Sequence, residues 1–451
     1  MAEKLSSQLA AMEALLDVNK LLDEKAHSQG LMFTTMDPTL RVKHGLSTGI
    51  YCFDLITGGG FASGRMSYLY GDTGSAKSTT LYHGLKSALD KSIIAVFNDH
   101  ESSVDPTYLG KIGIDLDAVC GKRNKKGVWE VTPKLRYSVG TTAEATFKFM
   151  NLVMRSLPDK IQMFDSKTEE YRYFLISPDY SYKPTWMHIN KGLKEDKIIE
   201  VEDFLPQMVF ITDSIKAMLP EAKDEDIDSD PIAMLARCLS INIPLVKSLI
   251  GRKNCIYLVT NHLNVNPMVK FGSPETEPGG KAVQYYPDLK MKMHVNRAQS
   301  KIIEETCANG EGIDRYIMGK TTVLKNKSGP CFRSSDFRIW IDTNGSPGHG
   351  IDPVFDIFNF LSLTGRLDQV SKETYGINLP GFETQKFTWK KFKELVLIQE
   401  DGKKLRQQIE QMISDGTALD LYYQYLSANP EKAAVKTGSD HKEDHVETVQ
   451  I

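Results

Sequence analysis

Short apolar runs alternate with helical patterns along the chain from about residue 45. The apolar runs are rich in β-branched and aromatic residues and end at turn residues, a pattern typical of buried strands. Predicted strands cover residues 66–70, 93–98, 208–212, 255–260 and 321–324. Strands that alternate with helices in this way indicate an α/β fold, in which a mostly parallel twisted sheet is flanked by helices.

The two ends of the chain carry other patterns. Leucine and methionine recur at helical spacing over residues 4–23, which predicts an N-terminal helix on a polar tether. Such a helix either folds back on its own domain or packs on another subunit. Three helical patterns after about residue 345 predict a small C-terminal helical domain: 353–363, 389–397 and 402–426. The polar tail is expected to be disordered.

Residues 160–206 interrupt the strand and helix rhythm with the aromatic and charged clusters YRYF and DYSYKPTW. We interpret them as an insertion that forms a β-hairpin. The predicted division is an N-terminal helix and linker, a core, a C-terminal domain and a tail, with boundaries at 1–44, 45–345, 346–426 and 427–451.

Composition narrows the classes of protein that fit this fold. Lys plus Arg total 55 against 58 Asp plus Glu, so the net charge of −3 does not attract polyanions and any nucleic-acid binding must be local. The six scattered cysteines show no spacing of a zinc site or redox dithiol, which fits a reducing cytoplasm. The N-terminus lacks a signal-peptide pattern, and no apolar run approaches the ~20 residues of a membrane span, so neither secretion nor membrane insertion is expected.

The segment RMSYLYGDTGSAKSTTLYHGL reads as a strand, a glycine-bearing loop and a helix. In a phosphate-binding loop, backbone N–H groups surround the phosphates, a lysine reaches the outer phosphates and the next hydroxyl ligates magnesium. Lys77 and Ser78 would take the last two roles, although the strict motif has glycine where this chain has Ala76. The alternative is an ordinary Gly/Ser turn that opens a helix. The ATP-binding residues predicted here are Gly71, Asp72, Thr73, Gly74, Ser75, Ala76, Lys77, Ser78 and Thr79.

Acidic residues follow two other predicted strands. Asp213 ends the run QMVFITD and could orient Mg²⁺ through a water, although buried strands also end in Asp for turn reasons. The run IIAVFND leads to Asp99 and Glu101. Glu101 could take a proton from an attacking water at the carboxyl edge of the sheet, and the alternative is a solvated loop carboxylate.

Four blocks, read in order, resemble the RecA recombinase family. They are LSTGIYCFDLITGGGFASGRMSYLYGDTGSAKSTTL, DHESSVDPTYLGKIGIDLD, NHLNVNPMVKFGSPETEPGGKAVQYYPDLKMKM and TVLKNKSGPCFRSSDFRIWID. The resemblance covers about residues 45–342 apart from the insertion. The relaxed phosphate loop and the pair Asn261 and His262 look most like phage recombinases of the UvsX type.

The resemblance implies roles for residues outside the phosphate loop. Glu101 would activate water, and Asp105 and Tyr108 would contact the adenine. Asn261 and His262 would sense the γ-phosphate and relay its state to a DNA-binding loop. His262 stands where cellular members have glutamine, so the relay could respond to pH. The alternative for His262 alone is a satisfied residue at a strand end.

Lys325 and Lys327 are two residues apart, so on a strand both ammonium groups project to the same side. The family resemblance, completed by Asn326, implies that they reach the nucleotide of a neighbouring subunit. ATP would then lie between subunits and its binding would join them. The alternative is a solvated edge strand, because lysines commonly protect sheet edges.

DNA contact is expected on the second loop, residues 263–280, where Phe271 could stack on a base or wedge against a base step. Arg237 aligns with a family phosphate contact. The first loop reads EAKDEDIDSDP, whose carboxylates would repel DNA, so no residue is assigned there. The alternatives are a flexible solvent loop and a helix-face charge. The predicted DNA-binding residues are Arg237, Lys270, Phe271, Gly272, Gly279 and Gly280.

The resemblance implies a DNA-dependent ATPase that uses ATP and Mg²⁺, forms helical homo-oligomeric filaments on single-stranded DNA and exchanges strands with double-stranded DNA in recombination and repair. A mediator or loader and a single-strand-binding protein are implied partners, without a membrane, in bacterial cytoplasm or a phage-infected cell. The alternatives are a ring-forming replicative helicase, against which the PETEPGG and KNK segments argue, and a nucleotide-binding mediator that exchanges no strands.

Overall fold

The computed structural model describes residues 44–165, 168, 170–177, 198–201, 205–221, 231–265, 275–295, 298, 301–342, 349–383 and 385–429. The expected N-terminal helix at 4–23 and the expected disordered tail lie outside these residues, apart from the tail's first positions. The centre of the second loop, with Lys270, Phe271 and Gly272, also lies outside them.

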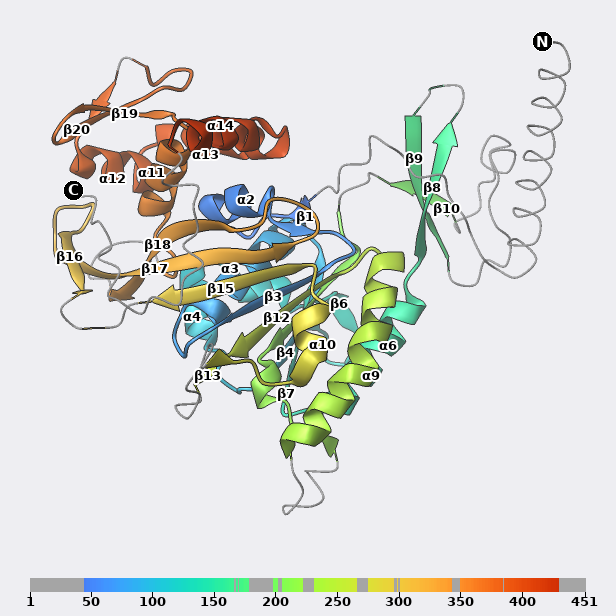
Figure 1. The fold of residues 1–451 in the computed structure, drawn as a ribbon. Coiled ribbons are helices and arrows are strands. Elements are labelled where there is room, and N and C mark those ends of the chain that lie inside the picture. Colours follow the sequence, from blue (N-terminus) through green and yellow to red (C-terminus); the bar gives the residue numbers. More distant parts are fainter. Residues whose placement is uncertain are drawn as a thin grey trace, which may run out of the picture.

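A nine-stranded sheet forms the body of the protein (Figure 1). Its order is β16-β17-β15-β3-β12-β11-β4-β7, and β18 pairs with β17. The strands from β15 to β7 are parallel, whereas β17 is antiparallel to its neighbours, so the predicted mostly parallel sheet is confirmed. The bounds are β3 Met66–Gly71, β4 Ile94–Asp99, β7 Leu135–Val139, β11 Met208–Asp213, β12 Ile256–His262, β15 Leu289–Val295, β16 Ile303–Thr306, β17 Ile313–Asn326 and β18 Arg333–Asp342.

Each predicted strand is present, and the one expected at 321–324 is the end of the longer β17. β3 and β11 are buried at every position, because helices cover both faces of the sheet there. β15 and much of β17 alternate between buried and more exposed residues, as antiparallel and flanking strands do.

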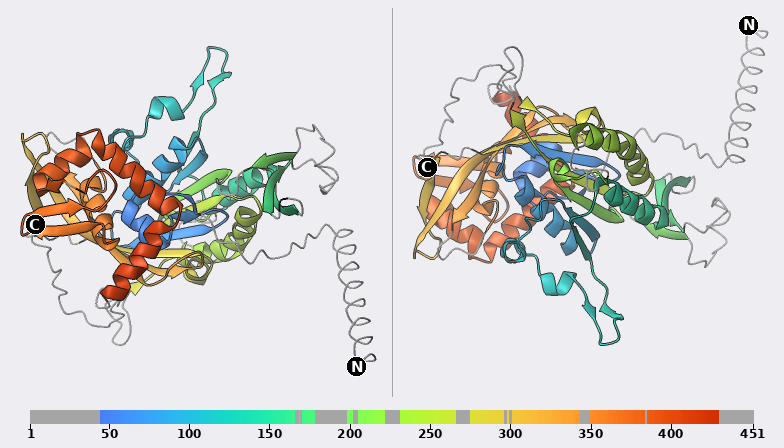
Figure 2. Two further views of the ribbon diagram at one scale, coloured as in Figure 1. Left: turned by 90° about the horizontal axis from the view of Figure 1, so that it is seen from above. Right: turned by 90° about the horizontal axis from the view of Figure 1, so that it is seen from below.

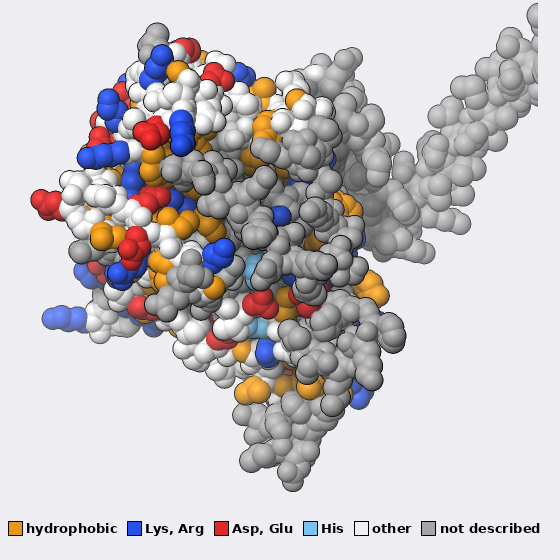
Figure 3. Space-filling view, turned by 60° about the vertical axis from the view of Figure 1, so that its left-hand side comes forward, with side chains coloured by type: hydrophobic (Ala, Val, Ile, Leu, Met, Phe, Trp, Pro, Cys, Tyr) orange, Lys and Arg blue, Asp and Glu red, His pale blue; other side chains and the backbone are white. Residues whose placement is uncertain are grey.

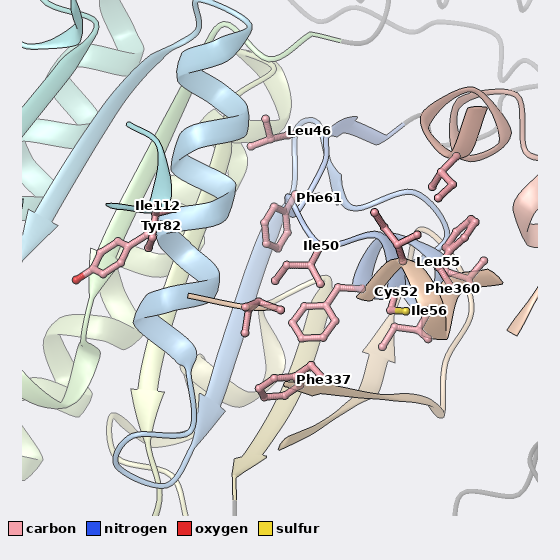
Figure 4. Packing of buried hydrophobic residues seen from close by; sticks show 14 of the residues in the cluster. Leu46, Ile50, Cys52, Leu55, Ile56, Phe61, Tyr82, Ile112, Phe337 and Phe360 are labelled. Atoms are coloured by element: carbon pink, nitrogen blue, oxygen red, sulfur yellow. The ribbon is translucent and has the colours of Figure 1, made fainter. Parts of the chain in front are cut away.

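Helices cover the two faces of the sheet (Figure 1). One face packs against α6 and α9, whose buried residues share a core with β3, β11 and β12. The other face packs against α3, which shares a larger core with α2 and the C-terminal segment. Figure 4 shows part of this core around Ile50, Phe61 and Phe337. The helix bounds are α2 Tyr51–Thr57, α3 Lys77–Asp90, α4 Pro106–Ile112, α5 Leu116–Val119, α6 Ala143–Ser156, α9 Pro231–Arg252, α10 Gly280–Tyr285 and the 3₁₀ helix η1 Ile215–Ala217.

α9 corrects one expectation. By length and composition alone, Ile232–Arg252 is apolar enough to cross a membrane, although no apolar run of that size was expected from the sequence. Its buried residues, such as Leu239, Ile243, Val246 and Ile250, recur at spacings of three and four. One face of α9 therefore packs on the sheet, as a helix of an α/β fold does.

The insertion forms the expected hairpin, β8 Asp159–Asp165 with β9 Glu170–Ile176, and a third strand, β10 Ile198–Val201, pairs with β9. Hydrogen bonds tie the start of the insertion to the main domain. Lys253 Nζ donates to Leu157 O at 2.6 Å, and Gln207 Nε2 donates to Pro158 O at 2.9 Å.

The C-terminal segment contains a three-stranded antiparallel sheet beside the expected helices. The helix expected at 402–426 is two helices, because Gly416 adopts a φ of 86° between them. The bounds are α11 Pro353–Leu363, β19 Leu367–Ser371, β20 Thr374–Ile377, β21 Lys386–Phe387, α12 Trp389–Leu397, α13 Asp401–Ser414 and α14 Thr417–Ala428.

Buried ion pairs fix this segment on the main sheet. The Arg338 guanidinium on β18 donates to Asp352 Oδ2 at 2.6 Å and also pairs with Glu305. Lys393 on α12 pairs with Asp314 on β17 at 2.8 Å. The remaining short strands are β1 His44–Leu46, β2 Phe61–Ala62, β5 Lys122–Arg123, β6 Trp129–Val131, β13 Asn264–Val265 and β14 Glu275–Thr276.

Candidate nucleotide site and its link to the second loop

The predicted phosphate loop lies between β3 and α3, at the carboxyl edge of the sheet. Only glycine fits at position 71, because a Cβ there would lie 2.0 Å from Met293 O. Ala76 has a φ of 68°, in the left-handed region that glycine favours. The alanine therefore adopts the conformation that the strict motif assigns to glycine, at a cost of roughly 1–2 kcal/mol.

Lys77 closes this loop. Its side chain is buried, and Nζ donates to Gly71 O at 3.0 Å and to Asp72 O at 2.6 Å. The loop backbone and the ammonium group are thus brought together at the N-terminus of α3, where an anion is also favoured by the helix dipole. This arrangement suits a triphosphate.

Asp213 ends β11 next to the loop. Burial raises the pKa of its carboxyl group, and the Ser78 and Thr260 hydroxyls lower it. Asp213 Oδ2 is buried and accepts no hydrogen bond from the described residues. Among those residues no cluster of three or more metal-ligating side chains occurs, so a cation here would take its other ligands from Ser78, phosphates and water. The pair fits Mg²⁺ held with a nucleotide.

Glu101 lies two residues beyond β4, and its Oε1 accepts two hydrogen bonds. Ser214 Oγ donates at 2.5 Å and His262 Nε2 lies at 2.8 Å. His262 Nδ1 lies 3.4 Å from Thr73 Oγ1 of the phosphate loop. The imidazole thus bridges the catalytic candidate and the phosphate loop. Histidine and acidic side chains also lie close together on the face drawn in Figure 3.

Asp99 holds the loop that carries Glu101. Its buried carboxylate accepts hydrogen bonds from the backbone N–H groups of Glu101, Ser103 and Val104, at 3.1, 2.9 and 3.0 Å. The Tyr137 hydroxyl donates to Asp99 Oδ2 at 2.8 Å. The sequence alone assigns no role to Asp99, because a carboxylate that caps a loop has no distinctive spacing.

His262 sets the acidity of Glu101. The hydrogen bond from His262 is the main cause that lowers the pKa of Glu101 from 4.5 to about 2, the Ser214 hydroxyl also lowers it, and burial opposes both. Because the folded-state pKa is lowered, this interaction stabilises the fold above the ordinary pKa and is lost as pH falls toward 2.

Replacing His262 with alanine is expected to raise the pKa of Glu101 toward 4.5, which NMR titration of ¹³C-labelled glutamate carboxyls would measure. Ser214→Ala is the matched comparison and should raise the pKa less, because its hydroxyl contributes less. An unchanged pKa in the His262 variant would contradict this account.

The two predicted adenine contacts lie on one short helix. Tyr108 OH lies 3.4 Å from Thr79 Oγ1 of α3, so it borders the phosphate loop's helix. Asp105 caps α4, where its carboxylate accepts from Thr107 N at 2.8 Å. The structure thus gives Asp105 a structural role, and its contact with adenine stays a prediction.

Asn261 links the end of β12 to the second loop. Its Nδ2 donates to Tyr68 OH at 2.9 Å and to Pro278 O at 2.8 Å, while Oδ1 accepts from His262 N at 3.0 Å. A movement of His262 would therefore act on the chain segment before Gly279. This geometry favours the predicted relay.

Two ion pairs also bind the second loop's end to β15. Lys290 pairs with Glu277 at 2.6 Å and Lys292 pairs with Glu275 at 2.6 Å. These pairs were not predicted, although the lysines two residues apart in LKMKM indicate one face of a strand. Gly279 packs closely, since a Cβ there would lie 2.9 Å from Leu239. Gly280 follows it at the start of α10.

Lys325 and Lys327 lie far from the phosphate loop of their own chain. Lys325 pairs in register with Lys290, which is level with Tyr68, near the amino end of β3. Gly71, where the phosphate loop begins, is at the carboxyl end of β3. At ~3.3 Å per residue, the step from Tyr68 to Gly71 separates the lysines from the loop by about 10 Å along the strand direction. The spacings from β17 to β15 and from β15 to β3 add to this distance.

A buried carboxylate gathers cations around these lysines. Asp288 pairs with Arg65 at 3.4 Å, with Lys247 and with Lys327 at 3.8 Å. Burial, together with the neighbouring Lys327, lowers the pKa of Lys325. Cations therefore outnumber carboxylates here, as expected of an anion-binding surface. Arg237 is elsewhere, exposed on α9.

The description "RecA N-terminal domain" belongs to the family model that matches residues 14–129 and 197–345. Its two parts exclude much of the insertion. The chain is 25% identical to "Protein RecA" of Nostoc punctiforme over 318 residues, which are 70% of this chain and 68% of the relative. It is 26% identical to "Protein RecA" of Frankia alni over 337 residues, which are 73% of this chain and 76% of the relative. For "Protein RecA" of Synechocystis sp. the identity is 23% over 335 residues, with 74% of each covered.

Proposed function

Because this chain belongs to the RecA family, whose N-terminal domain model matches more than half of it, we propose how its residues divide the work of a recombination ATPase. The protein is a DNA-dependent ATPase of recombination and repair that binds DNA and forms filaments. The proposal concerns which groups hold the nucleotide, which group activates water and how DNA and a neighbouring subunit are coupled to them.

Residues 71–79 hold the triphosphate of ATP, with Lys77 released from the Gly71 and Asp72 carbonyls to contact the outer phosphates. Ser78 and Asp213 would hold Mg²⁺, which would supply positive charge to stabilise the charge of the phosphates. Tyr108 and Asp105 border the adenine. This assignment is supported by the position of three groups at the N-terminus of α3: the buried Lys77, Ser78, and Asp213 Oδ2, which accepts no hydrogen bond from the described residues.

Glu101 is the general base that takes a proton from the attacking water. In the described conformation Glu101 Oε1 accepts hydrogen bonds from Ser214 and His262, and these bonds make Glu101 a weaker base. When His262 turns its Nε2–H toward a γ-phosphate, Glu101 becomes a stronger base. The same movement acts through Asn261 on Pro278 and the second loop. Nucleotide state is thereby transmitted to the residues that bind DNA.

One observation carries the proposal that ATP lies between subunits. Lys325 and Lys327 lie toward the sheet edge opposite the phosphate loop, so they serve the nucleotide of a neighbour. Arg65 and Lys247 enlarge this basic surface, and Asp288 orients it. Hydrolysis removes the γ-phosphate that both subunits hold, which loosens the filament.

The other assignments follow the division at 1–44, 45–345, 346–426 and 427–451. The N-terminal helix docks on the adjacent core, and the C-terminal domain guides duplex entry. Arg237 and the second loop, with Lys270, Phe271 and Gly272, contact single-stranded DNA. A mediator or loader and a single-strand-binding protein assist assembly in the cytoplasm.

Strand exchange between homologous DNAs tests this function. With ATP, Mg²⁺ and circular single-stranded DNA, the protein is expected to form helical filaments in electron micrographs and convert a homologous linear duplex into joint molecules. A heterologous duplex is the control and should give none. Closed rings that unwind DNA would indicate the helicase alternative, and ATP binding without joint molecules would indicate the mediator alternative.

A further inference from the structure

The hairpin formed by β5 and β6 projects from the body of the protein beside β7, the edge strand of the sheet (Figure 2). Residues 120–136, CGKRNKKGVWEVTPKLR, carry six cations and one carboxylate, a formal charge of +5. The whole chain carries −3, so the other residues together carry −8. The hairpin is therefore a local basic element on an otherwise acidic chain.

Hydrogen bonds and one glycine define the hairpin's turn. Asn124 Oδ1 accepts hydrogen bonds from Lys126 N at 2.9 Å and from Val128 N at 3.1 Å, and Gly127 N donates to Asn124 O at 2.9 Å. Gly127 has a φ of 78°, which favours glycine. Lys125 and Lys126 are consequently presented at the exposed tip in a fixed turn.

Two arginines stack on one tryptophan at the hairpin's stem. The guanidinium carbons of Arg123 and Arg136 lie 4.1 and 5.2 Å from the ring centre of Trp129. Stacking holds a guanidinium by its face and leaves its N–H edge available to an acceptor. Within the described part of the chain, neither arginine has a carboxylate partner, and the same is true of Lys122.

We propose that the β5–β6 hairpin binds the phosphodiester backbone of duplex DNA, at a site separate from the second loop. Fixed, exposed cations without acidic partners suit phosphates, and a two-stranded ribbon is of a width that the major groove of B-DNA admits. The inference rests on DNA binding by the filament.

The position of the hairpin favours a second DNA molecule. The hairpin leads into Leu135, which pairs with Ala95 near the amino end of β4. The second loop follows His262, at the carboxyl end of β12. The two elements thus follow opposite ends of the parallel strands. If a single strand of DNA is held at the second loop, the hairpin remains available to the incoming duplex.

The test compares the wild-type chain with the triple variant Lys122→Gln, Lys125→Gln and Lys126→Gln, which leaves the Trp129 stack intact. Filaments formed on single-stranded DNA with ATP would capture a labelled heterologous duplex at several salt concentrations. The slope of log affinity against log salt is expected to become shallower by about 1 to 3, because each lost phosphate contact removes ~0.9. Binding of the single strand should keep its slope.

Two further variants control for folding and for general charge loss. Arginine at the same three positions should retain the wild-type slope. Gln at Lys91, Lys111 and Lys148, which are exposed elsewhere, should leave the slope unchanged. An unchanged duplex slope in the hairpin variant overturns the proposal, as does a change confined to single-stranded DNA. Shorter filaments with both slopes unchanged would overturn it in favour of a subunit contact. Failure of wild-type filaments to form would instead contradict the proposed function.

Discussion

Replacing Glu101 with glutamine is expected to slow ATP turnover by roughly 10²- to 10⁴-fold, the usual contribution of a general base. The amide keeps an oxygen that can accept from Ser214 and His262, so the local geometry should persist. ATP binding and filament formation should therefore remain. Steady-state ATPase assays with saturating single-stranded DNA would measure the loss, and nucleotide binding would be measured separately.

The matched control for this experiment is Glu304→Gln. Glu304 pairs with Arg315 at 2.9 Å on an exposed part of the sheet, so its loss should leave turnover within about twofold, as expected of a surface ion pair. Normal turnover in the Glu101 variant would reassign the base. Asp99 would not replace it, because its carboxylate is committed to holding the loop.

Removing the Lys77 ammonium group with Lys77→Ala is expected to abolish detectable ATP binding and all DNA-dependent turnover. Lys77 is the buried cation of the phosphate loop, and no other described lysine side chain bonds to that loop. The readout is thermal unfolding with and without Mg-ATP. Ligand binding raises the midpoint of the wild-type protein by mass action, and the variant should show no such rise.

Lys86→Ala provides the comparison on the same helix. Lys86 is partly exposed and pairs with Asp90 four residues on, so its removal should change the midpoint little and preserve the rise with Mg-ATP. A Lys77 variant that is still stabilised by Mg-ATP would contradict the assignment of the phosphate loop.

The fold was predictable where the chain is buried on both sides. β3 and β11 read as continuous apolar runs because helices cover both faces of the sheet. β7 was missed, since it is an edge strand with exposed residues such as Tyr137 and Val139. β15 is not among the strands that the apolar pattern predicts, although LKMKMHV alternates, because its polar positions look like a surface loop without the partner strands.

The nucleotide site was predictable because motif residues lie close together along the chain or directly after a strand. Lys77, Asp213 and Glu101 met at one edge as parallel topology requires. The pairs Lys290–Glu277 and Lys292–Glu275 depend on the register between β15 and its neighbours, which no local pattern determines. The gathering of Arg65, Lys247 and Lys327 around Asp288 likewise depends on three-dimensional packing.

The most direct test of the shared ATP site is a cryo-electron microscopy structure of the filament on single-stranded DNA with a slowly hydrolysed ATP analogue. The account predicts that the ammonium groups of Lys325 and Lys327 from one subunit lie about 3 Å from the γ-phosphate held by the adjacent subunit's Lys77. A filament in which both lysines lie away from every triphosphate would contradict it.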